Sequence, residues 1–402
     1  MSYWKTHIPP GVQDFLPDEC FNKITLEQKV REVFDSWSYL EVDPPSFEYF
    51  DVFSEGKPSI QQEQIFKFFE LGSRILVLRP DFTMPIARIV ATKLKGESLP
   101  IRLSYIGNIY RYEREQSGKQ REIAQAGVEL MGVEGPEADA EVIAIAIESM
   151  KSIGLTDFQI DLGQVEFYKG IIEQCGLNNE QSDRLTVLID NKDMLTLELF
   201  LNDLDMSKEL KQLMKLPLLY GDVDMLKEAS KIANNPRSRA AIDNLYAVYA
   251  ILDDYGLSEY ITFDLGMIHS INYYTGIIFR GMTDDIGYPI CGGGRYDKLV
   301  SEFGYDIPAT GFALGIKRLL IALERQGGLS SKPGIDALVV FDKDNRKKGY
   351  SYRQQLRRSG KRVEHFLLDR RTVEPEQYAK AKSIGTIIKV EDNTIEELDL
   401  KD

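Results

Sequence analysis

The stretch from Ile101 to Val133 reads IRLSYIGNIYRYEREQSGKQREIAQAGVELMGV. It contains three strand-like runs, Ile101–Tyr105, Gly107–Tyr112 and Ala124–Val133, each bounded by a turn signal or a polar stretch. No helical pattern separates them, and consecutive strands without a crossover helix pair in antiparallel fashion. The stretch therefore predicts an antiparallel sheet with helices packed on it, which is a domain of the α+β class.

The surrounding sequence supplies the other elements of such a domain. A long amphipathic helix is expected from Asp18, as its N-cap, to the turn at residues 36–38, and further helices are expected at Pro136–Met150 and Phe312–Arg325. Residues of about 168–256 follow an almost wholly helical pattern without a catalytic constellation, which predicts a helical insertion. The remaining strand-like runs are Ile75–Leu78, Phe158–Leu162, Ile261–Leu265, Thr275–Arg280 and Tyr288–Cys291.

A stretch of glycine, serine and proline at residues 327–334 predicts a linker between domains. We therefore expect one domain over residues 1–326 and a second over residues 333–402. The first part is strongly acidic and the second weakly basic. The tail alternates apolar runs with helical stretches, which predicts a small three-stranded α/β domain.

Composition excludes several classes of protein. Hydrophobic residues make up 43% and charged residues 28% of the 402 residues, as in ordinary globular chains. No apolar run approaches the roughly 20 residues that cross a bilayer, and the N-terminus has no signal-peptide pattern, so we expect no membrane contact and a cytoplasmic protein. Cys20, Cys175 and Cys291 are far apart and histidines are few, which predicts neither disulfides nor a metal site. The net charge of −14 disfavours nucleic-acid binding by the chain as a whole.

The segment Arg79-Pro80-Asp81-Phe82-Thr83 follows an apolar strand and precedes a helix that starts near Met84. Asp81 and Thr83 can together hold an ammonium group, one by charge and the other by a hydrogen bond. The alternative is that Asp81 or Thr83 caps the helix, and the segment taken by itself favours this second interpretation.

The predicted hairpin carries a second group of polar residues. Arg111 and Glu113 are two residues apart on one strand and share a face, so that they can bind a carboxylate or phosphate. The alternative is a solvated hairpin with surface ion pairs. On the return strand, Gln125, Gly127 and Glu129 share one face and would form a floor for a small polar ligand.

Tyrosines and glycines mark two later segments, residues 271–276 and 292–297. The second reads Gly-Gly-Gly-Arg-Tyr-Asp, which allows close backbone approach but lacks the Gly-Lys-Ser/Thr ending of a phosphate-binding loop. The alternative is a structural turn with tyrosines in the core.

Taken in order, these segments resemble the catalytic domain of histidyl-tRNA synthetase, which has a class II aminoacyl-tRNA synthetase fold. The resemblance begins at Gly11–Pro17, includes the hairpin and Tyr273–Gly276, and ends with Gly292–Asp297 and Gly311–Arg318. It covers about residues 5–325 apart from the helical insertion. It implies a class II aminoacyl-tRNA synthetase-like antiparallel sheet with flanking helices.

Four positions depart from the synthetase pattern. His269 stands where the synthetases have an arginine that assists amino-acid activation, and a neutral imidazole cannot replace a permanently charged guanidinium. Ile123 replaces the aromatic residue that stacks on adenine, Glu115 replaces a proline, and Lys119 replaces a second arginine. The tail is also shorter than the anticodon-binding domain of the family.

These departures resemble the group of synthetase paralogues that serve as regulatory subunits of ATP phosphoribosyltransferase. That group carries Arg-Pro-Asp-Xaa-Thr, as at residues 79–83 here, where synthetases carry Arg-Pro-Glu-Gly-Thr. The resemblance implies a protein with no catalytic residue, no cofactor and no aminoacylation. It implies allosteric feedback inhibition by L-histidine, and a homodimer core assembled with a short-form catalytic subunit into a hetero-octamer.

The implied pocket holds the zwitterion and the ring of histidine by separate groups. The residues are Asp81, Thr83 and Gln125 for the ammonium group, Arg111 for the carboxylate, Glu129, Tyr274 and Tyr296 for the imidazole, and Tyr273 with Asn272 as supporting residues. Arg318 resembles the ATP-binding arginine of the third class II motif, and the alternative is that it serves as a structural ion-pair partner.

Two other interpretations stay open. One is an active histidyl-tRNA synthetase with an unusual site, and the other is a scaffold or RNA-binding relative that binds no histidine. Histidine affinity separates the scaffold from the other two, and formation of histidyl-adenylate separates the synthetase from the regulator.

Overall fold

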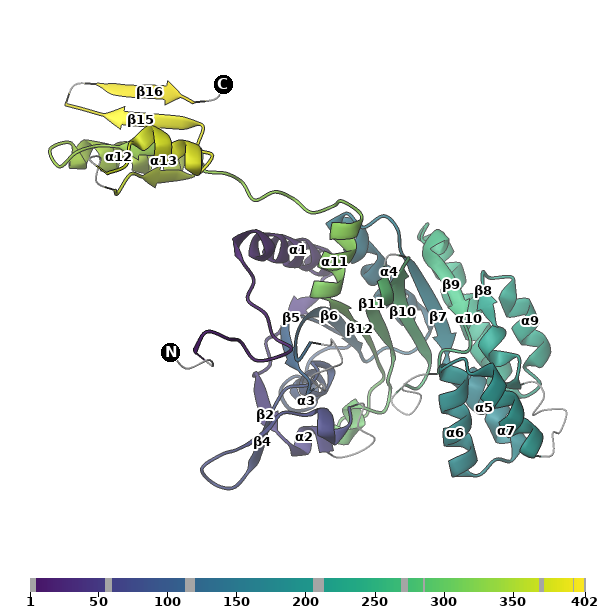
Figure 1. Cartoon of the computed structure of the whole chain (residues 1–402). Coiled ribbons are helices and arrows are strands. Elements are labelled where there is room, and N and C mark those ends of the chain that lie inside the picture. Colours follow the sequence, from purple (N-terminus) through teal and green to yellow (C-terminus); the bar gives the residue numbers. More distant parts are fainter. Residues whose placement is uncertain are drawn as a thin grey trace. The chain divides into compact units, whose positions relative to one another are not determined.

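The computed structural model describes residues 5–54, 60–112, 120–204, 213–268, 274–284, 286–368, 372–392 and 394–400 (Figure 1). The chain divides into two units, Met1–Leu329 and Ser330–Asp402. The boundary between them falls within the Gly327–Gly334 stretch.

A mixed sheet forms the centre of the first unit. Its nine strands in the described residues are β1 (Leu40–Glu41), β5 (Ile101–Tyr110), β6 (Glu122–Met131), β7 (Gln159–Gln164), β8 (Tyr220–Gly221), β9 (Ile261–Asp264), β10 (Ile277–Thr283), β11 (Ile286–Arg295) and β12 (Ala309–Gly315). They lie in the order β1-β5-β6-β12-β11-β10-β7-β9-β8. The pairs β1–β5 and β7–β9 are parallel and the other six pairs are antiparallel. The predicted α+β class with a largely antiparallel sheet is therefore confirmed.

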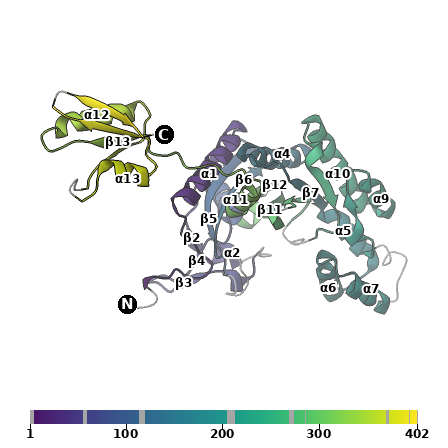
Figure 2. The same ribbon diagram turned by 45° about the horizontal axis from the view of Figure 1, so that its top comes forward.

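One face of this sheet is covered by α1 (Pro17–Ser36), α4 (Pro136–Ile153) and α11 (Ile316–Arg325), as Figures 1 and 2 show. Helix α4 packs against both α1 and α10 (Pro236–Asp254), and against β12. Its apolar side chains are buried all round, including Ile143, Ile145 and Ile147 at 0% exposure. A helix that is apolar on every side is stable only when neighbours enclose it, and this one lies between the sheet and two helices.

The opposite face of β5 and β6 carries a second core. Helix α3 (Thr83–Lys93) contributes Ile86 and Val90, and β5 contributes Leu103 and Tyr105. A small antiparallel sheet in the order β2-β4-β3 and several short helices complete this side. Their bounds are β2 (Phe47–Tyr49), β3 (Lys67–Phe69), β4 (Ile75–Leu78), α2 (Asp51–Ser54), η2 (Gln62–Gln64) and η5 (Val300–Phe303).

The segment between β7 and β9 is mainly helical, as predicted. Its described helices are α5 (Val165–Cys175), α6 (Asn179–Asp190), α7 (Met194–Asp203), η3 (Leu216–Leu218), α9 (Met225–Ile232), α10 and η4 (Ser258–Tyr260). The two-residue strand β8 also lies in this segment and pairs with β9, so the insertion extends the central sheet. In the part of the chain that the structure describes, no helix is long and apolar enough to cross a membrane.

The second unit contains a four-stranded sheet in the order β14-β13-β15-β16 rather than the predicted three strands. Its elements are β13 (Ala337–Val340), α12 (Arg346–Arg358), β14 (Val363–His365), α13 (Pro375–Ala381), β15 (Thr386–Val390) and β16 (Ile395–Asp399). The additional strand β16 is antiparallel to β15 and mostly exposed. Its acidic sequence suits an edge strand and has no core-facing alternation, so the apolar pattern did not predict it.

Three local predictions were wrong. Helix α1 begins at Pro17 rather than after an Asp18 cap, and the Leu16 N–H donates to Glu19 Oε2 at 3.0 Å. The two strands expected before the hairpin are one ten-residue strand, β5. The helix expected from Phe312 begins at Ile316, because residues 309–315 form β12 between β6 and β11.

Candidate functional site

A buried carboxylate lies at the centre of the site. Glu129, in β6, is 1% exposed, and both of its oxygens accept hydrogen bonds from side chains. The Thr83 hydroxyl, at the first residue of α3, donates to Oε1 at 2.8 Å. The Tyr296 hydroxyl, directly after β11, donates to Oε2. Three elements that are far apart in sequence thus meet at one acid.

The neighbouring strand leaves space for this acid because it carries a glycine there. Gly311 of β12 is the Cα partner of Glu129, and Gly294 of β11 is the next partner across the sheet. A Cβ atom added to Gly311 would lie 1.9 Å from Glu129 Oε2 and 2.5 Å from the backbone oxygen of Val128. Any side chain at Gly311 would therefore displace the Glu129 carboxylate or the strand.

The sequence left open whether Asp81 and Thr83 cap the helix or bind a ligand, and the structure gives the two residues different hydrogen bonds. Asp81 Oδ1 accepts the Met84 N–H at 3.0 Å, so Asp81 does stabilise the start of α3. Thr83 instead directs its hydroxyl proton to Glu129. Burial raises the pKa of Asp81, while the Met84 N–H and the positive charge of Arg111 act in the opposite direction.

Arg111 follows the end of β5 and donates from Nε to the Pro80 carbonyl at 2.9 Å. This bond ties the guanidinium to the Arg79–Thr83 segment. Its charge also acts on Asp81, Tyr105 and Tyr274. A fixed guanidinium opposite an acid is the arrangement that binds the two charges of an amino-acid zwitterion.

Aromatic rings form the walls around these charges. Tyr105 of β5 stacks on Phe82, with ring centroids 4.3 Å apart and planes at 17°. Gly127 lies opposite Tyr105, and a Cβ added there would lie 2.5 Å from the Tyr105 hydroxyl oxygen. Burial and the charge of Glu129 both raise the pKa of Tyr274, whose ring packs near Gly294. The walls are flat, and the tyrosine hydroxyls stay protonated at neutral pH.

Electrostatics favours a proton on Glu129. Burial and, less strongly, the charge of nearby Asp81 raise the pKa of Glu129 to about 8, against the stabilising hydroxyls of Tyr296 and Thr83. Two acids with raised pKa values thus lie near each other. A cationic or proton-donating ligand would favour their ionised forms, because it would replace the solvation that burial removes.

The structure brings together six of the eight residues assigned to the pocket, which are linked by contacts or mutual charge effects. Gln125 lies on the same strand as Glu129, opposite Gly107 and four residues before Glu129. The six are Asp81, Thr83, Arg111, Glu129, Tyr274 and Tyr296. Tyr273, with Asn272 and His269, lies outside the described residues, as do Glu113, Glu115 and Lys119.

Sequence reasoning missed Tyr105 and Phe82. Tyr105 could have been found from strand pairing, because a hairpin that closes symmetrically places it opposite Gly127. For Arg318 the sequence left two roles open, an ATP-binding arginine and a structural ion-pair partner. Its Nη1 donates to the Pro289 carbonyl at 2.6 Å, and its guanidinium lies over the Tyr288 ring at 5.1 Å. Its described contacts are therefore a carbonyl and an aromatic ring.

Arg295 was considered part of a glycine-rich binding turn, but its contacts are structural. It is 7% exposed, and its Nε donates to Asp139 Oδ1 of α4 at 3.0 Å. Its Nη1 donates to Asp297 Oδ1 at 3.0 Å. These bonds fix the end of β11 and with it the position of Tyr296. Within the described ranges, no group of three or more His, Cys, Asp or Glu residues is arranged to hold a metal ion.

Comparisons with known proteins extend over almost the whole chain. The family model described as histidyl-tRNA synthetase matches residues 11–319. A protein of Acetivibrio thermocellus named ATP phosphoribosyltransferase regulatory subunit is 48% identical over 394 residues, which cover 98% of this chain and 94% of that protein. A protein of the same name from Ruminiclostridium cellulolyticum is 46% identical with the same coverage.

Solved structures agree with these relatives. A crystal structure described as an ATP phosphoribosyltransferase regulatory subunit/histidyl-tRNA synthetase from Bacillus halodurans has a TM-score of 0.87 and 31% identity, and the match covers 97% of this chain and 99% of that one. The histidyl-tRNA synthetase of Nostoc has a TM-score of 0.81 at 21% identity, covering 98% and 97%. The second likeness shows the fold alone.

Proposed function

The chain belongs to the ATP phosphoribosyltransferase regulatory subunits within the histidyl-tRNA synthetase family, and from this premise we propose that it is the subunit that senses histidine. Its partner would be a short-form catalytic subunit, joined to a homodimer core of this chain in a cytoplasmic hetero-octamer. Histidine would bind in the pocket around Glu129 and inhibit the catalytic subunit by feedback.

The single observation that carries the proposal is the doubly hydrogen-bonded, buried Glu129 beside Asp81 and Arg111. Histidine offers an ammonium group, a carboxylate and a ring with one N–H donor and one acceptor. The pocket offers an acid for the first, a guanidinium for the second and an acid with tyrosines for the third. Each charged or polar group of histidine therefore has a complementary group in the site.

The ammonium group would lie against Asp81 and Gln125, with Thr83 as a third acceptor. The Thr83 hydroxyl donates its hydrogen bond to Glu129, so the lone pairs on Oγ1 can accept a hydrogen bond from an ammonium N–H. The carboxylate would pair with Arg111. The imidazole would place its N–H on Glu129 between the rings of Tyr274 and Tyr296, and an analogue without a ring nitrogen would leave the buried acid unpaired. Tyr273 keeps its assignment as a supporting residue.

Tight binding of histidine is not sufficient for inhibition. Histidine must bind the inhibited state of the assembly more tightly than the active state, because a ligand with equal affinity for both shifts neither. By reciprocity, the substrates of the catalytic subunit would weaken histidine binding by the same factor.

The test is phosphoribosyl-ATP formation by a short-form catalytic subunit from the same organism, measured with and without this chain while histidine is titrated. Stimulation that becomes sensitive to histidine is the expected result. Stimulation without histidine sensitivity would leave a scaffold role, and the absence of both would overturn the regulatory proposal.

A second assay separates the remaining alternative, an active histidyl-tRNA synthetase. Histidine-dependent exchange between ATP and pyrophosphate is expected to be absent. Exchange above the level of a protein-free control would show that adenylate forms, and the chain would then be an enzyme.

A further inference from the structure

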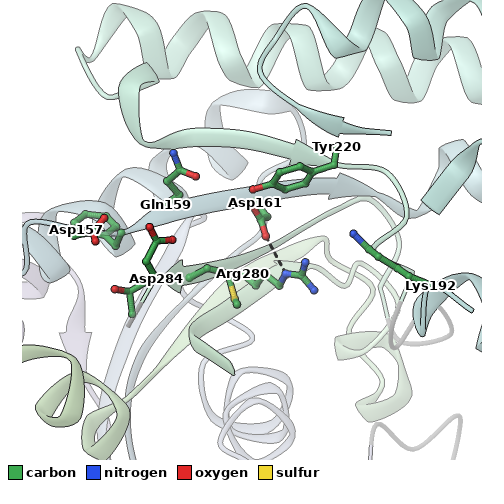
Figure 3. Close-up of a pocket in the computed structure, with 10 residues that line it drawn as sticks. Asp157, Gln159, Asp161, Lys192, Tyr220, Arg280 and Asp284 are labelled. Atoms are coloured by element: carbon green, nitrogen blue, oxygen red, sulfur yellow. Dashed lines mark hydrogen bonds and ion pairs between the residues drawn. The ribbon is translucent and has the colours of Figure 1, made fainter. Parts of the chain in front are cut away.

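A cavity of about 520 Å³ lies between the central sheet and the helical insertion (Figure 3). Strands β7 and β10 contribute Asp161, Arg280 and Met282, while the insertion contributes Lys192 and Tyr220. This volume is within the range of small-molecule sites. The cavity shares no lining residue with the pocket around Glu129.

One end of the cavity is a rigidly built cluster of two cations, Arg280 and Lys192, and two acids, Asp161 and Asp264. Arg280 donates from Nε to Asp161 and from Nη2 to Asp264, each at 3.0 Å. The two carboxylates are 3% and 0% exposed, and Asp264 also accepts from Lys192 Nζ at 3.2 Å. Two buried acids thus fix one edge of the guanidinium, and no hydrogen bond in the described residues uses Nη1. An arginine held in this way is preorganised to take an anionic group.

The other end of the cavity is acidic. Asp284 directly follows β10, and Asp157 lies two residues before β7. Because β10 and β7 are antiparallel partners, the two acids lie at the same edge of this strand pair. Figure 3 shows them on the side of the cavity away from Lys192 and the Arg280 guanidinium. Asp284 is four positions from Arg280, which is on the order of 13 Å at a rise of about 3.3 Å per residue.

Between the two ends, the lining includes apolar side chains. Met282 and Phe158 line the cavity, while the Tyr220 ring lies near Asp161 and Arg280 at the first end. Met282 is the Cα partner of Gln159, midway between the charged ends. A thioether and an aromatic ring form a surface for methylene groups.

From this arrangement we propose that the cavity binds an elongated zwitterionic small molecule. Its anionic group lies on Arg280 and Lys192, its cationic group lies beside Asp157 and Asp284, and an apolar stem of several methylenes crosses Met282. Because Lys192 and Tyr220 belong to the insertion and Arg280 to the sheet, such a ligand links the insertion to the sheet.

The probe for this site is 6-aminohexanoate, which has one charge at each end of a methylene chain. Its two halves, hexanoate and pentylamine, each lack one charge. Binding to the full-length chain is followed by ligand-observed NMR in titrations at constant ionic strength. We expect saturable binding of 6-aminohexanoate at concentrations where neither half binds, and binding that persists with histidine present in excess.

Variants at both ends test the assignment without removing the buried acid partners. Lys192→Gln and Asp284→Asn change exposed positions, and each is expected to weaken 6-aminohexanoate about fivefold. Lys231→Gln removes a matched exposed ion pair on α9 and serves as the control. Absence of saturable binding, equal binding of either half, displacement by histidine, or unchanged affinity in both cavity variants would overturn the proposal.

Discussion

Thr83 and Glu129 are joined by a hydrogen bond of 2.8 Å, from the Thr83 hydroxyl to Glu129 Oε1, although they are 46 positions apart in sequence. The bond connects the first residue of α3 to the middle of β6. Asp81, two residues before Thr83, accepts the Met84 N–H of the same helix. The start of α3 is therefore both a structural terminus and one wall of the pocket.

Glu129→Gln is expected to reduce histidine affinity at least tenfold, because an amide keeps the shape of the carboxylate but loses its charge and one acceptor. Isothermal titration calorimetry on the full-length chain measures the affinity. Glu122→Gln is the matched control, since Glu122 lies on the other face of the same strand and accepts from Asn108 at 2.7 Å. Equal losses in both variants would contradict a specific role for Glu129.

Histidine binding is expected to release protons near pH 7. Glu129 has a pKa of about 8, so it is mostly protonated at pH 7, and an imidazole N–H or a nearby ammonium group favours its ionised form. Affinity should therefore rise with pH up to about 8 and then level off. Calorimetry in buffers of different ionisation enthalpy counts the protons, and proton uptake at pH 7.5 would contradict the expectation.

The same carboxyl affects stability in the absence of ligand. Its folded-state pKa of about 8 lies above the ordinary value of 4.5, so the unfolded chain loses this proton first as the pH rises. The contribution of Glu129 is fully present below about pH 4.5 and is lost progressively up to about pH 8, by an amount on the order of a few kcal/mol. Chemical denaturation at pH 5 and pH 8 should show Glu129→Gln gaining stability relative to the wild type between the two values. A constant difference would argue against this titration.

Gly311→Ala is expected to abolish histidine binding and to lower the free energy of unfolding by about 1–3 kcal/mol, because the new Cβ overlaps Glu129 Oε2 and a backbone oxygen. Gly292→Ala is the control on the adjacent strand, where the nearest heavy atom to the added Cβ is 3.7 Å away. Urea denaturation and histidine titration are measured for both. Normal histidine affinity in Gly311→Ala would show that the pocket tolerates displacement of Glu129.

Sequence patterns predicted the elements whose burial is one-sided or complete. Strand β4 and helix α4 have the expected type. The first residue of α4 agrees because Pro136 suits the start of a helix, and α4 ends at Ile153, three residues beyond the expected Met150 and directly before Gly154. The end of strand β12 was misplaced, with Phe312–Gly315 assigned to the following helix, because these four residues carry no polar side chain and run directly into α11. Neither strand nor helix periodicity separates such residues.

The pocket residues were assigned by resemblance, because single-sequence physics cannot bring Asp81, Glu129 and Tyr296 together. The alternation of side chains along a strand showed only that Gln125, Gly127 and Glu129 share a face. The contacts of Thr83 and Tyr296 with Glu129 depend on the register of three strands and on the path from β11 to η5, which no local pattern encodes. The same holds for the cavity at Arg280, whose partners Asp161 and Asp264 look like ordinary strand acids in the sequence.

The proposed contact between Arg111 and the histidine carboxylate can be tested by combining a variant of the protein with an analogue of the ligand. Its Nε bond to the Pro80 carbonyl fixes the guanidinium beside Asp81, and a lysine at this position keeps the charge without the planar fork. Arg111→Lys should weaken histidine about tenfold or more if the fork pairs with the carboxylate. Histidinol, which has a hydroxymethyl group in place of that carboxylate, should bind both proteins equally, because the lost interaction is already absent. If Arg111→Lys weakens histidine and histidinol by the same factor, the arginine acts by positioning Asp81 and its segment, and the carboxylate lies elsewhere in the pocket.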